Sequence, residues 1–317
     1  MKIVITGSIA FDYLMHYPGK FSESFMADKL NNISLSFLVD SMKKHPGGTA
    51  PNIAYTMALL GSSPRVMATA GQDFKEYRAA LEAVGVDTSA IVAIEDDFTA
   101  SFFVNTDDEQ NQIATFYTGA MAYAKDLTFA QYAPDAELTI ISPNDPTAMR
   151  NHAEECRELS IPFIYDSSQQ TARLSGEDLA ASLKGAYMLT LNDYEYDLIK
   201  EKTGLSDSDI REQVDGLLVT KGKEGALLWM DAKEYHIPVV PPQEVKEPTG
   251  VGDAFRAGLM RGMELKLPWP VAGRMGALAA TYVLENVGTQ NHNFTPEEFV
   301  ARYREHFDDE GALDILI

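Results

Sequence analysis

The sequence contains a single cysteine, Cys156, among 317 residues. An intramolecular disulfide and a cysteine-based metal site are therefore both excluded, and we expect a protein of a reducing compartment, the cytoplasm. Long hydrophobic runs are missing as well. The opening stretch "MKIVITGSIAFDYL" is too short an apolar run for a secretion signal, and no later run reaches the length of a membrane-spanning helix. We therefore expect no membrane partner.

Basic residues are scarce relative to acidic ones. The chain has 26 lysines and arginines against 47 aspartates and glutamates, which gives a formal net charge of −21. Such a chain repels nucleic acid and anionic lipid unless a local basic patch forms, and its basic residues are scattered along the sequence. The composition therefore argues against a nucleic-acid partner.

Several common catalytic and nucleotide-binding motifs are absent. There is no G-x-x-x-x-G-K-[ST] phosphate loop, and no G-x-G-x-x-G follows the first strand-like segment. The six histidines lack the spacing of metal ligands, and no Ser–His–Asp or Cys–His arrangement stands out. These absences exclude the common phosphate loop and argue against a dinucleotide-binding fold.

Short apolar strands alternate with helical patterns along most of the chain. This alternation predicts an α/β fold with a doubly wound, mostly parallel sheet flanked by helices on both faces. The expected strands are 2–7, 64–71, 137–142, 162–166, 186–192 and 216–222. The expected helices are 49–61, 74–85, 146–159, 193–204, 252–266, 270–286 and 295–307.

Two stretches break this rhythm. Residues 11–45 contain the polar–apolar alternation "NISLSFLVD", and residues 98–118 contain two β-like runs joined by a polar turn. We interpret both as inserts that form a small β-sheet lid over the main sheet. No interdomain linker is evident, so we expect one domain over 1–317 with this lid.

The segment "EPTGVGDAF" (247–255) places an acidic residue, Asp253, directly after two glycines at the start of an apolar helix. The backbone N–H groups of Gly250, Val251 and Gly252 can converge on one anion there, helped by the helix dipole. A carboxylate beside a bound phosphoryl group suits a general base, and we expect the dipole to keep it ionised. The alternative is that Asp253 only caps the helix.

Two further segments combine polar side chains with helix starts. In "HPGGTAPNIA" (45–54), Gly48 lets a ligand approach the backbone and Asn52 offers a donor and an acceptor to hydroxyls. In "NDYE" (192–195), Glu195 suits Mg²⁺ held through water near polyphosphate, with Asn192 on the same face. The alternatives are an ordinary loop-to-helix turn in the first case and a helix-start carboxylate in the second.

Two weaker candidates complete the set. The turn in "VTKGKEGA" (219–226) could bring backbone N–H groups to phosphates, although it also reads as a plain β-hairpin. Asp12, close behind a buried strand and a Gly–Ser turn, could bind two neighbouring hydroxyls, or it could be an exposed lid residue.

In this order the motifs resemble those of the ribokinase-like carbohydrate and nucleoside kinases, the phosphofructokinase-B type. The likeness spans nearly the whole chain. The usual D-T-x-G-A-G-D is altered to Glu247, Pro248 and Val251, while both glycines and Asp253 are retained. The change leaves in question only the monovalent-cation loop beside this motif.

The resemblance implies an ATP-dependent kinase that uses Mg²⁺ and K⁺. Asp253 would be the base, and Gly250, Val251 and Gly252 the anion hole. Glu195 would organise Mg²⁺, and Glu247 and Thr249 would lie at the K⁺ site. The nucleotide-binding residues implied are Asn192, Thr220, Lys221, Gly222, Gly225 and Gly252. The substrate-binding residues implied are Ser8, Asp12, Ser36, Gly48, Asn52, Phe102, Phe116, Met121, Gln169 and Gln170.

Within this family the chain is most similar to bacterial adenosine kinases of the same architecture. The segments "DSSQQTARL" (166–174), "PTGVGDAFRAG" (248–258) and "GTQNHNFTPEEF" (288–299) carry that similarity. Phe102 and Phe116, on the two lid runs, are expected to sandwich a purine, unless they only bury the inner face of the lid. The resemblance favours adenosine as acceptor and a homodimer through the lid. A ribose or fructose kinase and a non-catalytic binding paralogue remain as alternatives.

Overall fold

The computed structural model describes residues 1–24 and 34–317. Its strands are β1 (Ile3–Thr6), β2 (Ala10–Tyr17), β3 (Ser41–Gly47), β4 (Arg65–Gly71), β5 (Ile91–Ile94), β6 (Ala100–Asp107), β7 (Gln112–Tyr117), β8 (Leu138–Ile141), β9 (Phe163–Asp166), β10 (Met188–Asn192), β11 (Gly216–Thr220), β12 (Ala226–Met230) and β13 (Lys233–Ile237). Its helices are α1 (Phe21–Ser24), α2 (Thr49–Leu59), α3 (Lys75–Ala83), α4 (Phe129–Tyr132), α5 (Pro146–Leu159), α6 (Gly176–Leu183), α7 (Asp193–Thr203), α8 (Asp207–Gln213), α9 (Val251–Glu264), α10 (Trp269–Leu284) and α11 (Pro296–His306).

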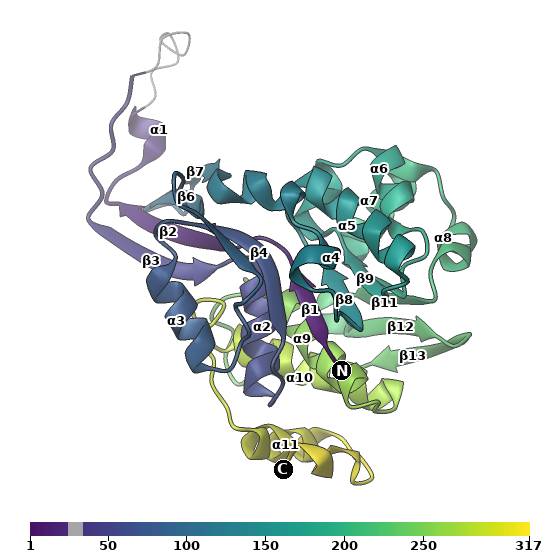
Figure 1. Ribbon diagram of the computed structural model, residues 1–317. Helices are drawn as coiled ribbons and strands as arrows, with labels where there is room; N and C mark the ends of the chain where they lie inside the picture. Colours follow the sequence, from purple (N-terminus) through teal and green to yellow (C-terminus); the bar gives the residue numbers. More distant parts are fainter. Residues whose placement is uncertain (25–33) are drawn as a thin grey trace.

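Nine strands form the large sheet, in the order β13-β12-β11-β10-β9-β8-β1-β4-β5 (Figure 1). The pairs from β11 across to β5 are parallel, whereas β12 and β13 form an antiparallel edge. From β1 the chain builds β4 and β5 on one side and β8 to β11 on the other. The strand order therefore reverses between β1 and β8, and the predicted doubly wound, mostly parallel sheet is confirmed.

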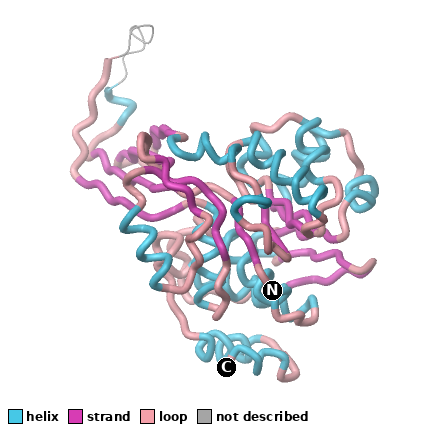
Figure 2. Tube along the Cα trace, in the orientation of Figure 1, coloured by secondary structure: helices cyan, strands magenta, loops and turns pink. Residues whose placement is uncertain are grey.

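Helices cover both faces of this sheet, as Figure 2 shows for the whole trace. Because side chains alternate along a strand, Ile3 and Ile5 of β1 pack with α2 and α9, while Val4 packs on the opposite side with α5. Among the helices of residues 1–24 and 34–317, none is long and apolar enough to cross a membrane.

A second sheet, in the order β3-β2-β6-β7, comes from the two predicted inserts. Strands β6 and β7 form the expected hairpin, and β6 pairs in parallel with β2. The expected strand over 32–40 is not found: residues 32 and 33 lie outside the described part, and no strand covers 34–40. Its alternation had no partner strand to bury it, and Leu38 is 87% exposed. On the side away from β6, the strand that pairs with β2 is instead the polar segment β3.

Candidate active site

A cavity of about 650 Å³ opens at the carboxyl ends of the parallel strands, beneath the small sheet. This volume lies in the range of small-molecule sites, and the strand-order reversal is where doubly wound sheets bind ligands. Its lining residues are Ser8, Ala10, Asp12, Gly48, Thr49, Asn52, Phe102, Phe116, Met121, Pro143, Ser168, Gln169, Gln170, Arg173, Asn192, Glu195, Thr220, Thr249, Gly250, Gly252, Asp253, Arg256 and Thr289.

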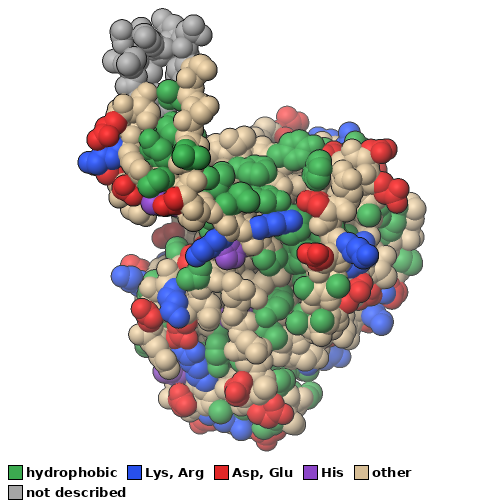
Figure 3. Space-filling view, turned by 90° about the vertical axis from the view of Figure 1, so that its left-hand side faces the viewer, with side chains coloured by type: hydrophobic (Ala, Val, Ile, Leu, Met, Phe, Trp, Pro, Cys, Tyr) green, Lys and Arg blue, Asp and Glu red, His purple; other side chains and the backbone are tan. Residues whose placement is uncertain are grey.

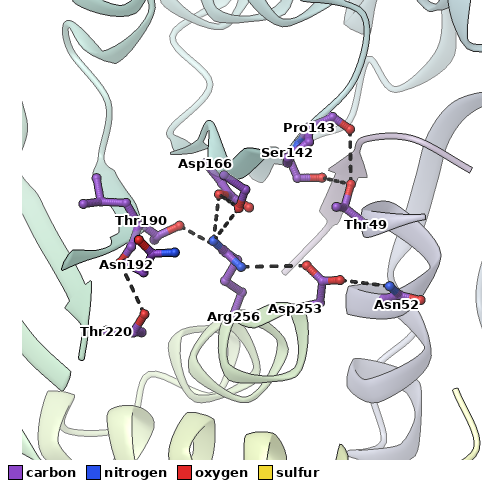
Figure 4. Close-up of polar contacts among 12 residues, drawn as sticks. Thr49, Asn52, Ser142, Pro143, Asp166, Thr190, Asn192, Thr220, Asp253 and Arg256 are labelled. Atoms are coloured by element: carbon purple, nitrogen blue, oxygen red, sulfur yellow. Dashed lines mark hydrogen bonds and ion pairs between the residues drawn. The ribbon is translucent and has the colours of Figure 1, made fainter. Parts of the chain in front are cut away.

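Asp253 lies in the first turn of α9, behind Gly250, which caps the helix in the left-handed conformation with φ 80°. Asn52 Nδ2 donates a hydrogen bond to Asp253 Oδ2 at 2.9 Å, and Arg256 Nη1 lies 3.8 Å from Oδ1 (Figure 4). Burial raises the pKa of Asp253 to about 6, although Arg256 and the Asn52 bond lower it. Desolvation is thus the largest effect on this carboxyl, and a pKa of about 6 still leaves it mostly ionised at neutral pH, as expected for a group at the start of a helix.

Arg256 is a buried cation, 8% exposed, one helical turn beyond Asp253. Its Nη2 donates to Asp166 Oδ1 at 2.7 Å and to Ser168 Oγ at 2.9 Å, and its Nε donates to Thr190 Oγ1 at 3.1 Å. Asp166 is the last residue of β9 and is fully buried. Burial raises the pKa of Asp166 to about 7, against the lowering effect of Arg256.

The side-chain amide of Asn52 is oriented by a hydrogen bond to its oxygen, which leaves its nitrogen for Asp253. Gln290 Nε2 donates to Asn52 Oδ1 at 2.8 Å and also to the hydroxyl of Tyr77. The Tyr77 hydroxyl in turn donates to Gly47 O at 3.0 Å. With its oxygen occupied, Asn52 presents its nitrogen to Asp253. Asn52 was expected to bind sugar hydroxyls, and the structure gives it this additional role.

Phe102 and Phe116 of the small sheet both line the cavity, but they do not lie on opposite sides of it. Phe102 and Phe116 face each other directly across the β6–β7 ladder. Side chains of directly opposed residues lie side by side on one face of a sheet, about 5 Å apart at Cβ. The expected sandwich around a flat base is therefore wrong: the two rings form one wall.

The remaining residues expected on the acceptor side fall into two groups. Asp12 and Gly48 line the cavity, as do Ser8, Met121, Gln169 and Gln170. Burial raises the pKa of Asp12 to about 6, with His45 opposing the shift and Glu247 adding to it. Ser36, by contrast, is exposed and does not line the cavity.

On the opposite wall, Asn192 and Glu195 form a reciprocal cap at the start of α7. Asn192 Oδ1 accepts from the Glu195 N–H at 2.8 Å, and Glu195 Oε2 accepts from the Asn192 N–H at 2.9 Å. Both residues also line the cavity. The capping and the binding interpretations therefore do not compete. Within the described ranges, Glu195 Oε1 has no hydrogen bond and is free to face a hydrated cation.

The turn after β11 contributes less than expected. Thr220 lines the cavity, but Lys221, Gly222 and Gly225 do not. The Lys221 N–H donates to Gly225 O and the Gly225 N–H donates to Gly222 O, so these donors are used inside the turn. The segment joins two antiparallel strands, β11 and β12, as a hairpin does.

The glycine turn before α9 also differs in detail from the expectation. Gly250 and Gly252 line the cavity, whereas Val251 packs against the hydrophobic core. The Val251 N–H donates to Pro248 O at 3.4 Å. Thr249 lines the cavity, and Glu247 Oε2 accepts from the Gly288 N–H at 2.9 Å, which ties two loops together. In the part of the chain that the structure describes, no group of three or more His, Cys, Asp or Glu side chains is arranged so that it could hold a metal ion.

Several cavity residues were not anticipated, among them Arg173, Arg256 and Thr289, and neither was Asp166, the buried partner of Arg256. Two of them left a signal in the sequence. Asp166 closes an apolar strand, "PFIYD", and Arg256 interrupts an apolar helix, "DAFRAGLM". A charge in such a position needs a buried partner. Their partnership was not evident because they are far apart in the sequence.

Comparison with known proteins bears on the identity of this site. Residues 8–296 match the pfkB family carbohydrate kinases. A nucleoside kinase of Methanothermobacter thermautotrophicus is 30% identical over 305 residues, covering 95% of each chain. A structure of Burkholderia thailandensis nucleoside kinase in complex with inosine has a TM-score of 0.85 and 35% identity, covering 96% of this chain and 98% of that one.

More distant structures share the fold. Ribokinase from Thermotoga maritima superposes with a TM-score of 0.79 at 19% identity, over 96% of this chain and 99% of that one. The fold is therefore ribokinase-like, with a small separate sheet beside the large one. The resemblance noted in the sequence is confirmed, and the chain belongs to the pfkB family of carbohydrate kinases.

Proposed function

We propose that this kinase transfers the γ-phosphoryl group of ATP to the primary 5′-hydroxyl of a purine nucleoside, with adenosine as the first acceptor to test. The observation that carries the proposal is the position of Asp253, between a wall of Asp12, Phe102 and Phe116 and a wall of Asn192 and Glu195. Relatives named nucleoside kinases support the acceptor class. One of them, from Burkholderia thailandensis, has a structure with ADP and inosine.

In the proposed reaction, Asp253 removes the proton of the 5′-hydroxyl while that oxygen attacks the γ-phosphorus. A new P–O bond forms, the bond to the β-phosphate oxygen breaks, and ADP leaves with the electron pair. Gly250 and Gly252, at the amino end of α9, lie where the helix dipole favours the transferred anion. Mg²⁺ bound with ATP would neutralise phosphate charge, and the carboxylate of Glu195 suits an outer ligand for it.

The other wall is suited to a nucleoside. Asp12 and Asn52 offer polar atoms for ribose hydroxyls, and the rings of Phe102 and Phe116 offer an apolar face to the base. Stacking of a base on an aromatic ring contributes about 1–3 kcal/mol. A free sugar would leave this aromatic wall without a partner, and for this reason we favour the nucleoside.

The decisive assay measures ADP release with ATP and a panel of acceptors: adenosine, inosine, guanosine, cytidine, ribose and fructose. We expect ADP with purine nucleosides, at kcat/KM values at least tenfold above those for the free sugars. ADP formed only with a free sugar would replace the nucleoside proposal by the sugar-kinase alternative. Binding without turnover for every acceptor would favour the non-catalytic paralogue.

We also propose a K⁺ site at the loop of Glu247 and Thr249. Thr249 lines the cavity and Glu247 anchors this loop to Gly288, so a bound cation would act on the conformation of the glycine turn that follows. We expect faster turnover in potassium than in tetramethylammonium buffer at equal ionic strength. Equal rates would rule out this site.

A further inference from the structure

The side chain of Arg256 is held far more rigidly than a surface arginine. Two of its three nitrogens are engaged by groups from other elements: Asp166 on β9, Thr190 on β10 and Ser168 in the segment after β9. The third nitrogen, Nη1, has no hydrogen bond within the described residues. That nitrogen is the one that lies 3.8 Å from Asp253 Oδ1.

The backbone leaves room for this placement. A Cβ atom on residue 252 would lie 2.8 Å from Arg256 Nη1, so the glycine at this position lets the guanidinium approach the turn that precedes the base. Arg256 also lines the cavity, which puts its charge within the reaction space and not behind it. Figure 4 shows Arg256 between Asp166 and Asp253, above the first turn of α9.

We propose that Arg256, anchored by Asp166, is a positioning residue that fixes the Asp253 carboxylate and favours its proton-accepting form. The inference rests on the proposed phosphoryl-transfer reaction, but it does not depend on which acceptor the enzyme uses. The carboxylate is held on two sides, by the Asn52 amide at Oδ2 and by the guanidinium at Oδ1. Of these two partners of Asp253, only Arg256 carries a positive charge, because Asn52 is neutral.

The charges around this arrangement come from three elements: Asp253 and Arg256 on α9, Asp166 on β9 and Glu195 on α7. An opposite charge within a few ångströms lowers the pKa of a carboxyl by about 1–3 units. Loss of the Arg256 charge therefore raises the pKa of Asp253. Asp166 holds the guanidinium through Nη2, and with a pKa of about 7 its carboxyl carries little charge at the pH where Asp253 titrates. Loss of this anchor therefore releases Arg256 from Asp253 and raises the pKa of Asp253 as well.

The test is the pH profile of kcat/KM from pH 5 to 9, measured per folded protein for wild type, Arg256→Gln, Arg256→Lys and Asp166→Ala. On the acidic limb of the profile, where kcat/KM rises with pH, we expect the midpoint for Arg256→Gln to lie about 1–3 pH units above that of wild type. The loss of kcat/KM relative to wild type should therefore be smaller at pH 9 than at pH 7. Arg256→Lys should restore the limb to its wild-type position with a reduced kcat. Asp166→Ala should also move the limb upward, because it removes the acceptor that fixes Arg256 Nη2.

The matched control is Arg261→Gln. Arg261 is also a mostly buried arginine of α9, ion-paired with Glu264 at 2.7 Å, but it does not line the cavity. We expect it to lower the unfolding temperature without moving the acidic limb. The proposal would be overturned if the acidic limbs of Arg256→Gln and wild type coincide within about 0.3 pH units, because a purely structural arginine would behave like Arg261.

Two other outcomes are also decisive. If Arg256→Gln does not fold, Asp166→Ala decides: an upward shift supports the proposal and an unmoved limb overturns it. If wild type accepts only a free sugar, the nucleoside proposal fails, but the same variants are compared with that sugar and the inference is tested unchanged.

Discussion

Asp253 combines a mostly buried carboxyl with two polar partners. Burial raises its pKa to about 6, while Arg256 and Asn52 work against the shift. The group must be deprotonated to accept a proton, so activity should rise with pH through about 6 and level off above it. A base whose pKa lies just below neutrality is largely ionised at neutral pH and still able to take a proton.

Replacement of Asp253 by asparagine should abolish most of the activity without unfolding the chain. We expect kcat to fall by about two to four decades, since the amide cannot accept the hydroxyl proton. ADP binding, measured by calorimetry, should persist. Asp207→Asn is the control, because Asp207 occupies the first turn of α8 far from the cavity. Activity of Asp253→Asn within threefold of wild type would remove the residue from the role of base.

Single residues were predictable where a local motif marks them. Asp253, Asn52 and Asn192 all stand at helix starts behind turn residues, and all line the cavity. The Asp166–Arg256 pair was not predictable, because its members are separated by 90 positions and meet only once β9 and α9 are packed. The packing of elements, and not a local pattern, creates this contact.

At the scale of elements, α7 both begins at the cavity and holds a second cavity-lining segment in place. Its first turn carries Asn192 and Glu195, and its last turn carries Lys202. Lys202 Nζ donates to three carbonyl oxygens, those of Thr171, Ala172 and Leu174, at 2.8–2.9 Å. These carbonyls belong to the segment that brings Gln169, Gln170 and Arg173 to the cavity.

The substitution Lys202→Met should loosen that segment. We expect the free energy of unfolding to fall by about 1–3 kcal/mol, since carbonyls lose a charged donor, and KM for the acceptor to rise more than KM for ATP. Lys200→Met is the matched control on the same helix, because Lys200 contacts the surface carboxylates of Asp197 and Asp207 and the ring of Tyr196, and does not bond the 171–174 segment. Unchanged stability and KM in Lys202→Met would show that the segment holds its shape without this lysine.

The β6–β7 hairpin supplies the aromatic wall, and its two faces can be separated by mutation. Phe102 faces the cavity, whereas its neighbour Phe103 stacks on Tyr13 with ring centroids 4.7 Å apart. We expect Phe102→Ala to raise KM for the nucleoside about tenfold and to leave KM for ATP nearly unchanged. Phe103→Ala should leave both values close to wild type. Equal weakening of both substrates by Phe102→Ala would show that the ring only holds the small sheet together.

Element types followed from periodicity, but pairing did not. The six expected strands of the large sheet and the seven expected helices matched their apolar patterns, because each is buried on both faces or along one stripe, whereas the edge strands β5 and β13 were not anticipated. Register across the hairpin depends on the turn and on neighbouring strands. The opposition of Phe102 and Phe116 could therefore not be anticipated, and the sandwich prediction failed for that reason.

At the scale of the whole molecule, the small sheet lies over the mouth of a site built by the large one. Ala10 and Ala100 of this sheet form only a small buried cluster, together with Met121, and a small sheet of this kind gains stability from what it covers. We expect it to close over a bound acceptor and exclude water from the transferred phosphoryl group. Closure of residues 11–45 and 98–118 stays a prediction.

The outer face of the small sheet is apolar in places. Met42 is 62% exposed, Ile113 39% and Phe103 37%. Figure 3 looks at the molecule from the side on which this sheet lies in Figure 1, and hydrophobic side chains gather on that face. A homodimer through the lid, as the resemblance implies, would cover such a surface, and it too stays a prediction.

The central claim is that the reacting group is the 5′-hydroxyl of a nucleoside and that Asp253 removes its proton. The most direct measurement is ADP formation with adenosine and inosine, compared with their 5′-deoxy analogues, together with phosphorus NMR of the product. The account predicts nucleoside 5′-monophosphate from at least one of the parent compounds and no ADP above background from either analogue. ADP formed equally with a 5′-deoxy analogue, or a product phosphorylated at another hydroxyl, would contradict it.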